Sequence, residues 1–276
     1  YLYYLKNIVL WGFGPFNSLL FIAGVIFTIK YFLQNFKLPK KQSTSYSIII
    51  YSLLNIYYFL LIGRSAVKFM RYMLPIYPFL AIVASYGFFK IEASILSKKI
   101  KTMFFALSLI LISTWSLSFF QIYRQPNTRL AASKWISSNI PPGSVLAVEH
   151  WDDRLPVFNS NLYEFVELQL YNTPDDNRKW QKITQDLEKA DYILLASNRL
   201  YVPLTKLKSC EKYERCYPLT AQYYEDLFSE KTDFIKIAEF TGYPTVPLLN
   251  VEIVDDKADE SFTVYDHPKI MIFKRN

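Results

Sequence analysis

The sequence has little of what most soluble enzymes use for chemistry. It contains two histidines and two cysteines in 276 residues, which is too few for a zinc site built by this chain alone. It also has no GxGxxG, P-loop, GxSxG or HExxH pattern, the signatures of dinucleotide binding, phosphate binding, acyl hydrolysis and zinc proteolysis. We therefore predict no metal and no cofactor within these residues, and leave open a divalent metal on sequence that precedes them.

Acidic residues are nearly absent from the first half of the chain. Residues 1–123 carry 12 Lys and Arg against one acid, Glu92, whereas residues 124–276 carry 19 against 23. The formal net charge of +7 is thus divided into +11 and −4. The positive excess lies in short segments beside apolar stretches, where membrane topology places Lys and Arg. Nucleic acid is therefore excluded as the partner that a basic chain would otherwise suggest.

Long apolar stretches alternate with these basic segments. About 20 apolar residues in a helix cross the hydrocarbon core of a bilayer, so the pattern predicts a membrane α-helical bundle of four transmembrane helices. Pro75 and Pro78 lie near the start of the third stretch, where a first helical turn tolerates proline. Four buried helices of a large soluble protein are the alternative. The predicted spans are about 15–33, 45–63, 72–89 and 102–123.

The first 14 residues, YLYYLKNIVLWGFG, form an aromatic and mildly amphipathic segment. Tyr and Trp favour the membrane–water boundary, so we predict an interfacial, extracytoplasmic segment over 1–14. The chain starts at Tyr1 without a recognisable signal peptide. We expect further sequence upstream.

The distribution of Lys and Arg predicts the orientation. The four on one side of the predicted bundle are Lys6, Arg64, Lys68 and Arg71. The eight on the other side are Lys30, Lys37, Lys40, Lys41, Lys90, Lys98, Lys99 and Lys101. Because the side richer in short-loop cations faces the cytoplasm, we predict a multi-pass protein of the cell membrane with residues 124–276 outside the cytoplasm.

Residues 124–276 alternate between helix and strand patterns. This alternation predicts a soluble α/β domain with a mainly parallel sheet and an antiparallel edge at the end. Asn127 or Thr128 is expected to cap the first helix, and a closing hairpin is expected to turn at His267-Pro268. The predicted helices continue with 175–190 and 219–230, and the predicted strands are 144–151, 191–197 and 234–241.

Three cations precede the third span, on the side that the charge rule disfavours. Arg64, Lys68 and Arg71 can be ordinary anchors to lipid headgroups. They can also bind the phosphate of a lipid-linked substrate and stabilise it as a leaving group. Both interpretations fit the sequence.

A run of acids and aromatics ends the first predicted strand of the soluble domain. Ligands approach open α/β sheets at the carboxyl ends of strands, and acids beside an aromatic ring suit sugar hydroxyls. We therefore consider Glu149, Trp151, Asp152 and Asp153 as acceptor-binding candidates. The alternative is a solvated turn around a packed Trp151, and a solvated turn is also the interpretation for Asp255-Asp256.

Cys210 and Cys216 are six residues apart. In an extracytoplasmic domain they can close a short disulfide loop, with two free thiols as the alternative. The spacing is not that of a CxxC redox pair.

Three stretches resemble bacterial lipid-carrier-dependent glycosyltransferases. These stretches are KFMRYMLPIYPFLAIVA, NTRLAASKWISSNIPPGSVLAVEHWDDRLP, and YPLTAQYYEDLF together with ADESFTVYDHPKIMIFKR. They are similar to the C-terminal part of the dolichyl-phosphate-mannose–protein mannosyltransferase group, glycosyltransferase family 39, which has the multi-spanning C-type fold. The likeness is specific at the C-terminus and looser in the apolar spans.

This resemblance implies a hexosyltransferase that moves a sugar from a polyprenyl-phosphate donor to an extracytoplasmic protein, lipid or glycan acceptor. Arg71 is the best match to the donor-phosphate ligand, with Lys68 beside it. The group takes its catalytic acid from its first extracytoplasmic loop, which these residues lack. The catalytic carboxylate is therefore expected upstream of Tyr1, and this fragment alone is expected to be inactive.

Two other classes stay open. One is a non-enzymatic, membrane-anchored binding or assembly protein that uses its α/β domain for contacts. The other is a transporter of a lipid-linked sugar, which would be expected to carry acids or broken helices inside its spans.

Overall fold

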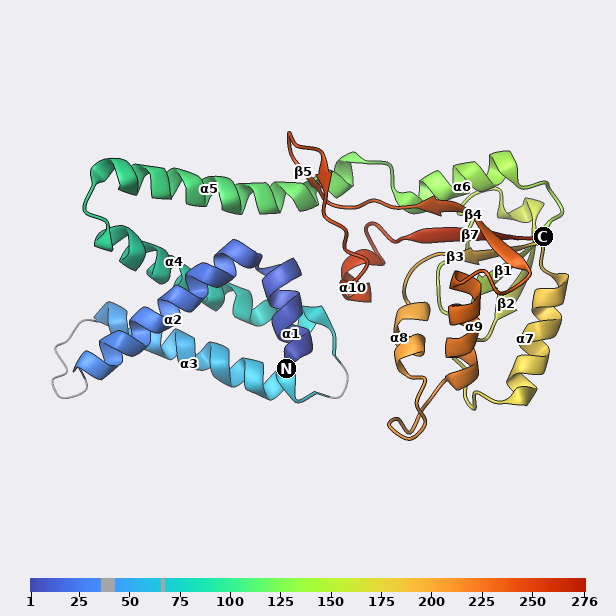
Figure 1. Cartoon of the computed structure of the whole chain (residues 1–276), viewed down its shortest axis with the longest axis horizontal. Helices are drawn as coiled ribbons and strands as arrows, with labels where there is room; N and C mark the ends of the chain where they lie inside the picture. The colour runs from blue at the N-terminus through green and yellow to red at the C-terminus, as the bar shows by residue number, and fades with distance from the viewer. Residues whose placement is uncertain (36–42, 66–67) are drawn as a thin grey trace. The chain divides into compact units, whose positions relative to one another are not determined.

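The computed structural model describes residues 1–35, 43–65 and 68–276. Lys37, Lys40 and Lys41, which the charge count assigned to the cytoplasmic side, lie outside the described residues. The chain divides into two compact units, which we call the helical unit and the α/β unit (Figure 1). The helical unit comprises Tyr1–Phe120 and Thr245–Val251, and the α/β unit comprises Gln121–Pro244 and Glu252–Asn276.

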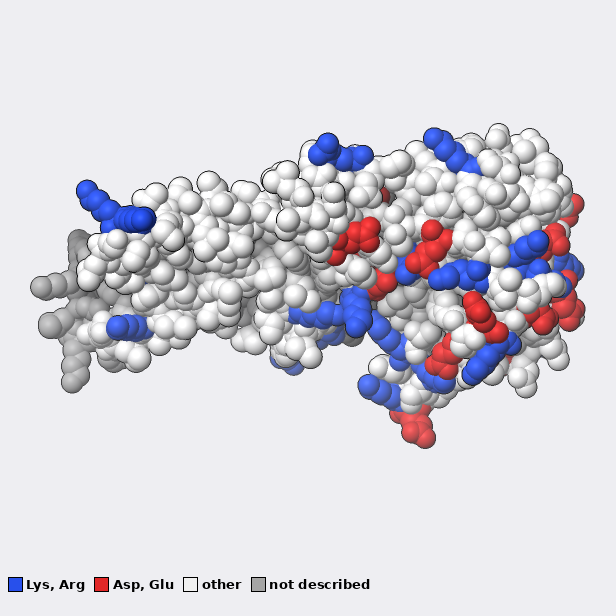
Figure 2. All heavy atoms as spheres, turned by 45° about the horizontal axis from the view of Figure 1, so that its top comes forward, with Lys and Arg blue, Asp and Glu red and all other residues white. Residues whose placement is uncertain are grey.

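The helical unit is built from long apolar helices with short helical pieces before two of them. Its surface is largely uncharged on the face shown in Figure 2, whereas both signs of charge are scattered over the α/β unit. Its elements are α1 (Leu2–Asn7), the π-helical turn η1 (Ile8–Gly12), α2 (Pro15–Asn35), α3 (Ser43–Gly63), the 3₁₀ helix η2 (Met70–Ile76), α4 (Tyr77–Ser94) and α5 (Lys98–Phe120).

Three helical runs in the described residues are long and apolar enough to cross a membrane: Pro15–Gln34, Met70–Ser94 and Lys98–Asn139, which contains α5. The fourth predicted span, 45–63, is helical as α3. Its described apolar part, Ser47–Gly63, is shorter than the other three. The sequence therefore predicted the helices, and three of them have the length and composition of a span.

Glycines bring α2 and α4 into close contact. A methyl group added at Gly24 would lie 2.1 Å from the carbonyl oxygen of Val83, and one added at Gly87 would lie 2.2 Å from that of Leu20. Helices in apolar surroundings associate through such small residues because their backbones can then approach closely. The two glycines thus fix where α2 and α4 cross.

The N-terminal segment packs against the start of α4. Tyr4 of α1 is fully buried and lies in one apolar cluster with Ile8, Met73 and Leu80. Pro75 falls inside η2, and Pro78 falls in the first turn of α4, where the absent N–H has no helical partner to lose. The two prolines thus account for a 3₁₀ start followed by a regular α-helix.

The α/β unit contains a five-stranded sheet in the order β2-β1-β3-β7-β4. Strands β1, β2 and β3 pair in parallel, and β7 pairs antiparallel with both β3 and β4. The strands are β1 (Val145–Glu149), β2 (Glu164–Leu168), β3 (Tyr192–Leu195), β4 (Phe234–Phe240) and β7 (Ile270–Arg275). The helices are η3 (Gln121–Arg124), α6 (Thr128–Asn139), η4 (Ser160–Leu162), α7 (Asn177–Lys189), α8 (Tyr201–Lys206), α9 (Pro218–Phe228) and α10 (Glu260–Thr263).

Side chains that point alternately to the two faces of the sheet form a hydrophobic core on each side of it. Leu146 and Leu194 face Ile136 of α6, whereas Ala147 and Ile193 belong to the core beneath α7, α8 and α9. Because successive strand residues point to opposite faces, fully apolar strands such as YILL of β3 serve both cores. The unit therefore has three layers, with one helix on one face and three on the other.

Two parts of the predicted sheet need correction. The sheet is mixed, because β7 lies inside it between β3 and β4, so the antiparallel strand is not at the edge. The predicted closing hairpin is wrong, because the residues shortly before His267-Pro268 form the short helix α10 instead of a strand. Asp259 caps this helix by accepting a hydrogen bond from the Ser261 N–H. Asn127 caps α6 by accepting from the Arg129 N–H, as one of the two predicted caps.

Candidate functional site

Arg64, Lys68 and Arg71 lie together in sequence between α3 and α4. Arg64 and Arg71 are exposed and Lys68 is half-buried. The Lys68 ammonium donates to the Ser65 carbonyl at 2.7 Å, and the guanidinium carbon of Arg71 lies 4.4 Å from the centre of the Phe69 ring. A local hydrogen bond thus holds the Lys68 ammonium, while the side chains of Arg64 and Arg71 remain accessible.

No carboxylate neutralises these three cations within the described part of the helical unit. Its single acid in residues 1–123, Glu92, pairs with Lys101 at 3.3 Å. Glu92 and Lys101 flank the loop between α4 and α5, whereas Arg71 precedes α4. Arg64, Lys68 and Arg71 therefore have no acidic partner among the described residues of this unit.

The N-terminal segment and the end of α5 lie at the same end as these cations. The Tyr3 hydroxyl donates to the Lys68 carbonyl at 3.4 Å. The rings of Trp11 and Phe119 meet edge to face at 6.4 Å. The chain therefore leaves the helical unit at the end that carries the three cations.

Glu149 closes β1 and is buried, with 4% of its surface exposed. The hydroxyl of Tyr224, from α9, donates to Oε1 of Glu149. Oε2 finds no hydrogen-bond partner among the described residues. Burial raises the pKa of Glu149 to about 8, against the smaller opposing effect of the Tyr224 hydrogen bond. This carboxyl group is therefore mostly protonated at neutral pH and inaccessible to a large acceptor.

Asp152 is buried in the turn that follows β1. Its side chain is 1% exposed, and its carboxylate accepts from the Ser197 hydroxyl at 2.5 Å and lies 4.0 Å from an Arg199 nitrogen. Burial raises the pKa of Asp152, although Ser197 and Arg199 oppose that effect. Ser197 and Arg199 follow β3, which is parallel to β1, so the carboxyl ends of both strands supply this network. The sequence did not single out Ser197 or Arg199.

Trp151 is the most exposed aromatic residue of this turn. Its backbone has a φ of 79°, the residue is 63% exposed, and its carbonyl accepts from Arg199 at 3.0 Å. Its ring meets those of His150 at 5.4 Å and Tyr171 at 6.5 Å, both edge to face. A bulky residue rarely adopts a positive φ, so the buried Asp152 network holds an aromatic ring out in solvent at a conformational cost.

Charged groups surround this ring. His150 and Arg154 both contact Glu167 of β2, and Asp153 pairs with Arg129 at 2.7 Å. Of the four acceptor-binding candidates, Trp151 and Asp153 are thus exposed. Glu149 and Asp152 are buried and act as supports. The turn is neither a simple solvated turn nor four side chains directed at one ligand.

A buried pair that the sequence did not predict lies at the same edge of the sheet. Asp255 and His267 are each 3% exposed in their side chains and meet at 2.7 Å. They help line a small cavity with Tyr201, Tyr243 and Lys269. The predicted solvated turn at Asp255-Asp256 is therefore correct for exposed Asp256 and wrong for Asp255.

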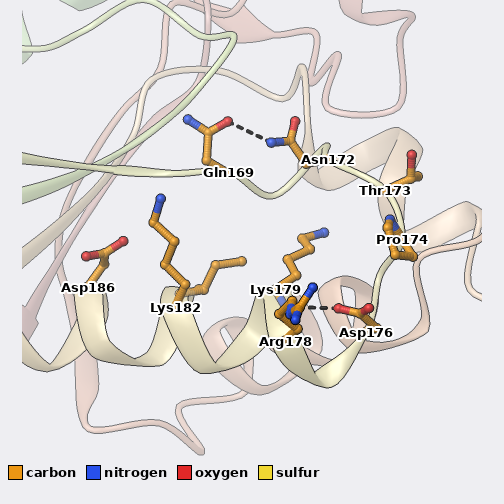
Figure 3. A pocket seen from close by; sticks show the side chains of 10 residues that line it. Gln169, Asn172, Thr173, Pro174, Asp176, Arg178, Lys179, Lys182 and Asp186 are labelled. Carbon is orange, nitrogen blue, oxygen red and sulfur yellow. Dashed lines mark hydrogen bonds between the residues drawn. The ribbon is translucent and has the colours of Figure 1, made fainter.

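A wider groove lies where α7 begins. It has a volume of about 330 Å³, and Figure 3 shows Gln169 and Asn172, after β2, facing Lys179 and Lys182 of α7. Lys179 is already engaged, since its ammonium donates to Asp175 at 2.8 Å. The other residues that line the groove include acids, bases and amides. This mixture does not indicate one class of ligand.

Cys210 and Cys216 form a disulfide in the structure. The bond closes the loop between α8 and α9. In the described part of the chain no group of three His, Cys, Asp or Glu is arranged to hold a metal ion.

No protein-family model, no curated protein and no solved structure matches this chain.

Proposed function

We propose that the chain is part of an integral membrane glycosyltransferase that moves a sugar from a polyprenyl-phosphate donor to an extracytoplasmic acceptor. The observation that carries the proposal is the set of Arg64, Lys68 and Arg71 at one end of an apolar helical unit, without a neighbouring carboxylate in its described part. A lipid-linked sugar phosphate has an apolar tail and a charged head, and this unit offers matching surfaces for both.

Arg71 and Lys68 would act on the leaving group. In the proposed direct displacement, an acceptor hydroxyl loses its proton to a carboxylate base and attacks the anomeric carbon. The bond from that carbon to the phosphate oxygen breaks, and the electron pair leaves with the polyprenyl phosphate. Cations fixed beside that oxygen favour the transition state over the ground state because negative charge builds up there. Arg64 would contribute a weaker, longer-range charge.

Trp151 would contact the acceptor. An exposed indole held by a buried network offers a rigid apolar face for a sugar ring or a peptide side chain, and Asp153 supplies a nearby acceptor for hydrogen bonds. Glu149 and Asp152 would position this turn without touching the acceptor.

The proposed location is the cell membrane, with the α/β unit outside the cytoplasm. The distribution of Lys and Arg supports this orientation, and the chain leaves α5 at the end with fewer cations. The donor phosphate and the acceptor would then both be bound on the extracytoplasmic side.

The test is the Arg71→Ala substitution in the full-length protein, with turnover of a lipid-linked sugar as the assay. The full-length protein is needed because the proposal assigns the catalytic carboxylate to sequence before these residues. A charge-assisted hydrogen bond to phosphate contributes about 1.5–3 kcal/mol, so kcat/KM should fall roughly 10- to 100-fold. The matched control is Lys90→Ala, which removes a cation near the opposite end of α4 and should leave kcat/KM unchanged.

Equal turnover by Arg71→Ala and the unsubstituted protein would contradict the role assigned to this cluster. A full-length protein that turns over no lipid-linked sugar under any condition would instead favour a non-enzymatic binding or assembly protein.

A further inference from the structure

The segment between β4 and α10 leaves the α/β unit and joins the helical unit as a short hairpin. Its strands β5 (Thr245–Val246) and β6 (Val251–Glu252) pair with each other and not with the large sheet. Residues Thr245–Val251 are part of the helical unit, and Figure 1 shows β5 beside the C-terminal end of α5, which it contacts. The hairpin is therefore an appendage of the apolar helices.

The tip of this hairpin is apolar and unusually exposed. Leu248 is 99% exposed and Leu249 is 71% exposed, and Val251 follows with 56%. No charged residue occurs from Thr241 to Val251. A contiguous apolar tip of this kind in a soluble environment marks a contact surface.

The backbone at the tip gives a second, independent indication. Leu248 has a φ of 68°, a left-handed conformation that glycine or asparagine adopts at much lower cost than leucine. The turn itself therefore does not favour a leucine here. A fully exposed leucine in this conformation contributes nothing to the packing of the chain, so its side chain serves a contact beyond it.

The neighbouring surface identifies the partner. The outward face of α5 carries large exposed apolar residues up to its end, including Leu117 and Phe120 at 48% and 58%. The hairpin continues this apolar surface. A lipid bilayer is the partner that covers such a face without needing shape complementarity or charge.

We propose that the tip of the β5–β6 hairpin inserts Leu248 and Leu249 into the surface of the bilayer beside the end of α5. The insertion is shallow, because loop backbone at greater depth needs internal partners for its polar groups. The hairpin meets part of that need: the Asn250 N–H donates to the Val246 carbonyl at 3.1 Å, and the Ile253 N–H donates to the Pro244 carbonyl at 2.7 Å. The proposal depends on the helical unit lying in a membrane and does not depend on sugar transfer.

The chain is well suited to a site-specific fluorescence test. Its only two cysteines are joined in a disulfide, so an introduced cysteine is the single reactive thiol. Leu248→Cys is labelled with nitrobenzoxadiazole in the whole chain and reconstituted into phosphatidylcholine vesicles, with and without lipids that carry a doxyl quencher on the acyl chain. Leu117→Cys on α5 serves as the lipid-facing control, and Val157→Cys, exposed by 55% in the α/β unit, serves as the aqueous control.

We expect the label at Leu248→Cys to emit at shorter wavelength than the label at Val157→Cys and to be quenched by doxyl lipids, as at Leu117→Cys. Leu249→Cys should behave in the same way. Emission and quenching equal to those of the Val157→Cys label would overturn the proposal. A shift to shorter wavelength without quenching would overturn it too, because the tip would then be covered by protein, either a partner or a second copy.

Discussion

The strongest prediction concerns the buried carboxyl group of Glu149. Glu149→Gln keeps the size and shape of the side chain and its oxygen partner for the Tyr224 hydroxyl, and removes only the ability to ionise. If Glu149 is protonated in the folded α/β unit at neutral pH, the substitution changes how stability depends on pH and leaves the packing intact.

The expected magnitude follows from the pKa. Folding raises the pKa of Glu149 from its ordinary value of 4.5 to about 8. At 1.36 kcal/mol per pH unit, this corresponds to about 5 kcal/mol. The sign is fixed by proton binding, because between these two pH values the folded state holds the proton and the unfolded state does not. The contribution of Glu149 to the free energy of unfolding is thus fully present below pH 4.5 and is lost as the pH rises through 8.

Urea unfolding of the detergent-solubilised chain between pH 5 and 9 measures this effect. Near pH 5 the original protein and Glu149→Gln should agree within about 1 kcal/mol, and above pH 8 the Gln variant should be more stable by about 4 kcal/mol. Difference infrared spectroscopy checks the protonation directly, since the C=O stretch of a protonated carboxylic acid should disappear in Glu149→Gln. Parallel pH dependences for the two proteins would refute the assignment of a buried, protonated Glu149.

Two further predictions test the packing of α2 against α4 and the ion pair between Asp175 and Lys179. Gly87→Ala places a methyl group 2.2 Å from the Leu20 carbonyl oxygen, so α2 and α4 must separate at a cost of about 1–3 kcal/mol in the free energy of unfolding. Thermal unfolding should show this loss of stability. The control Ser85→Ala, at an exposed position of the same helix, should leave the stability unchanged. Asp175→Asn removes the charge that pairs with buried Lys179 and should lower the free energy of unfolding in urea by about 3–5 kcal/mol. The control Asp186→Asn, whose partner Lys189 is exposed, should lower it by less than about 1 kcal/mol. Burial acts to raise the pKa of Asp175, but hydrogen bonds from Lys179 and Thr220 lower it overall, so its contribution is present at neutral pH and lost in acid; an Asp175→Asn protein as stable as the original would contradict this account.

Sequence patterns predicted the elements with strong periodicity and missed those without it. The apolar spans and the helix α7 were visible because hydrophobicity over many residues carries the signal. Strand β2, EFVEL, was missed because it lies at the edge of the sheet with exposed Glu164, and α8 because it is six residues long and contains Pro203. Short elements of this kind are stabilised by tertiary contacts, which local sequence does not encode.

The candidate site, too, was predicted from the sequence only in part. Chain position indicated that Trp151 lies at the carboxyl end of a strand, where ligands approach. It did not indicate that Asp152 turns inward to Ser197 and Arg199, which lie more than 40 residues away in sequence. Neither did it reveal the pairing of Asp255 with His267, because that contact depends on β7 entering the middle of the sheet.

The central place of β7 has a consequence for the order in which the protein is made. Every other strand of the large sheet precedes β7 along the chain, and β3 and β4 each pair with it directly. Until Ile270–Arg275 has been synthesised, β3 lacks a partner on one edge and β4 lacks one on both edges, and such edges bind other strands readily. The α/β unit therefore completes its fold only after its last strand has been synthesised. The interval between the synthesis of β4 and the synthesis of β7 is thus the period in which this unit is most exposed to aggregation and proteolysis.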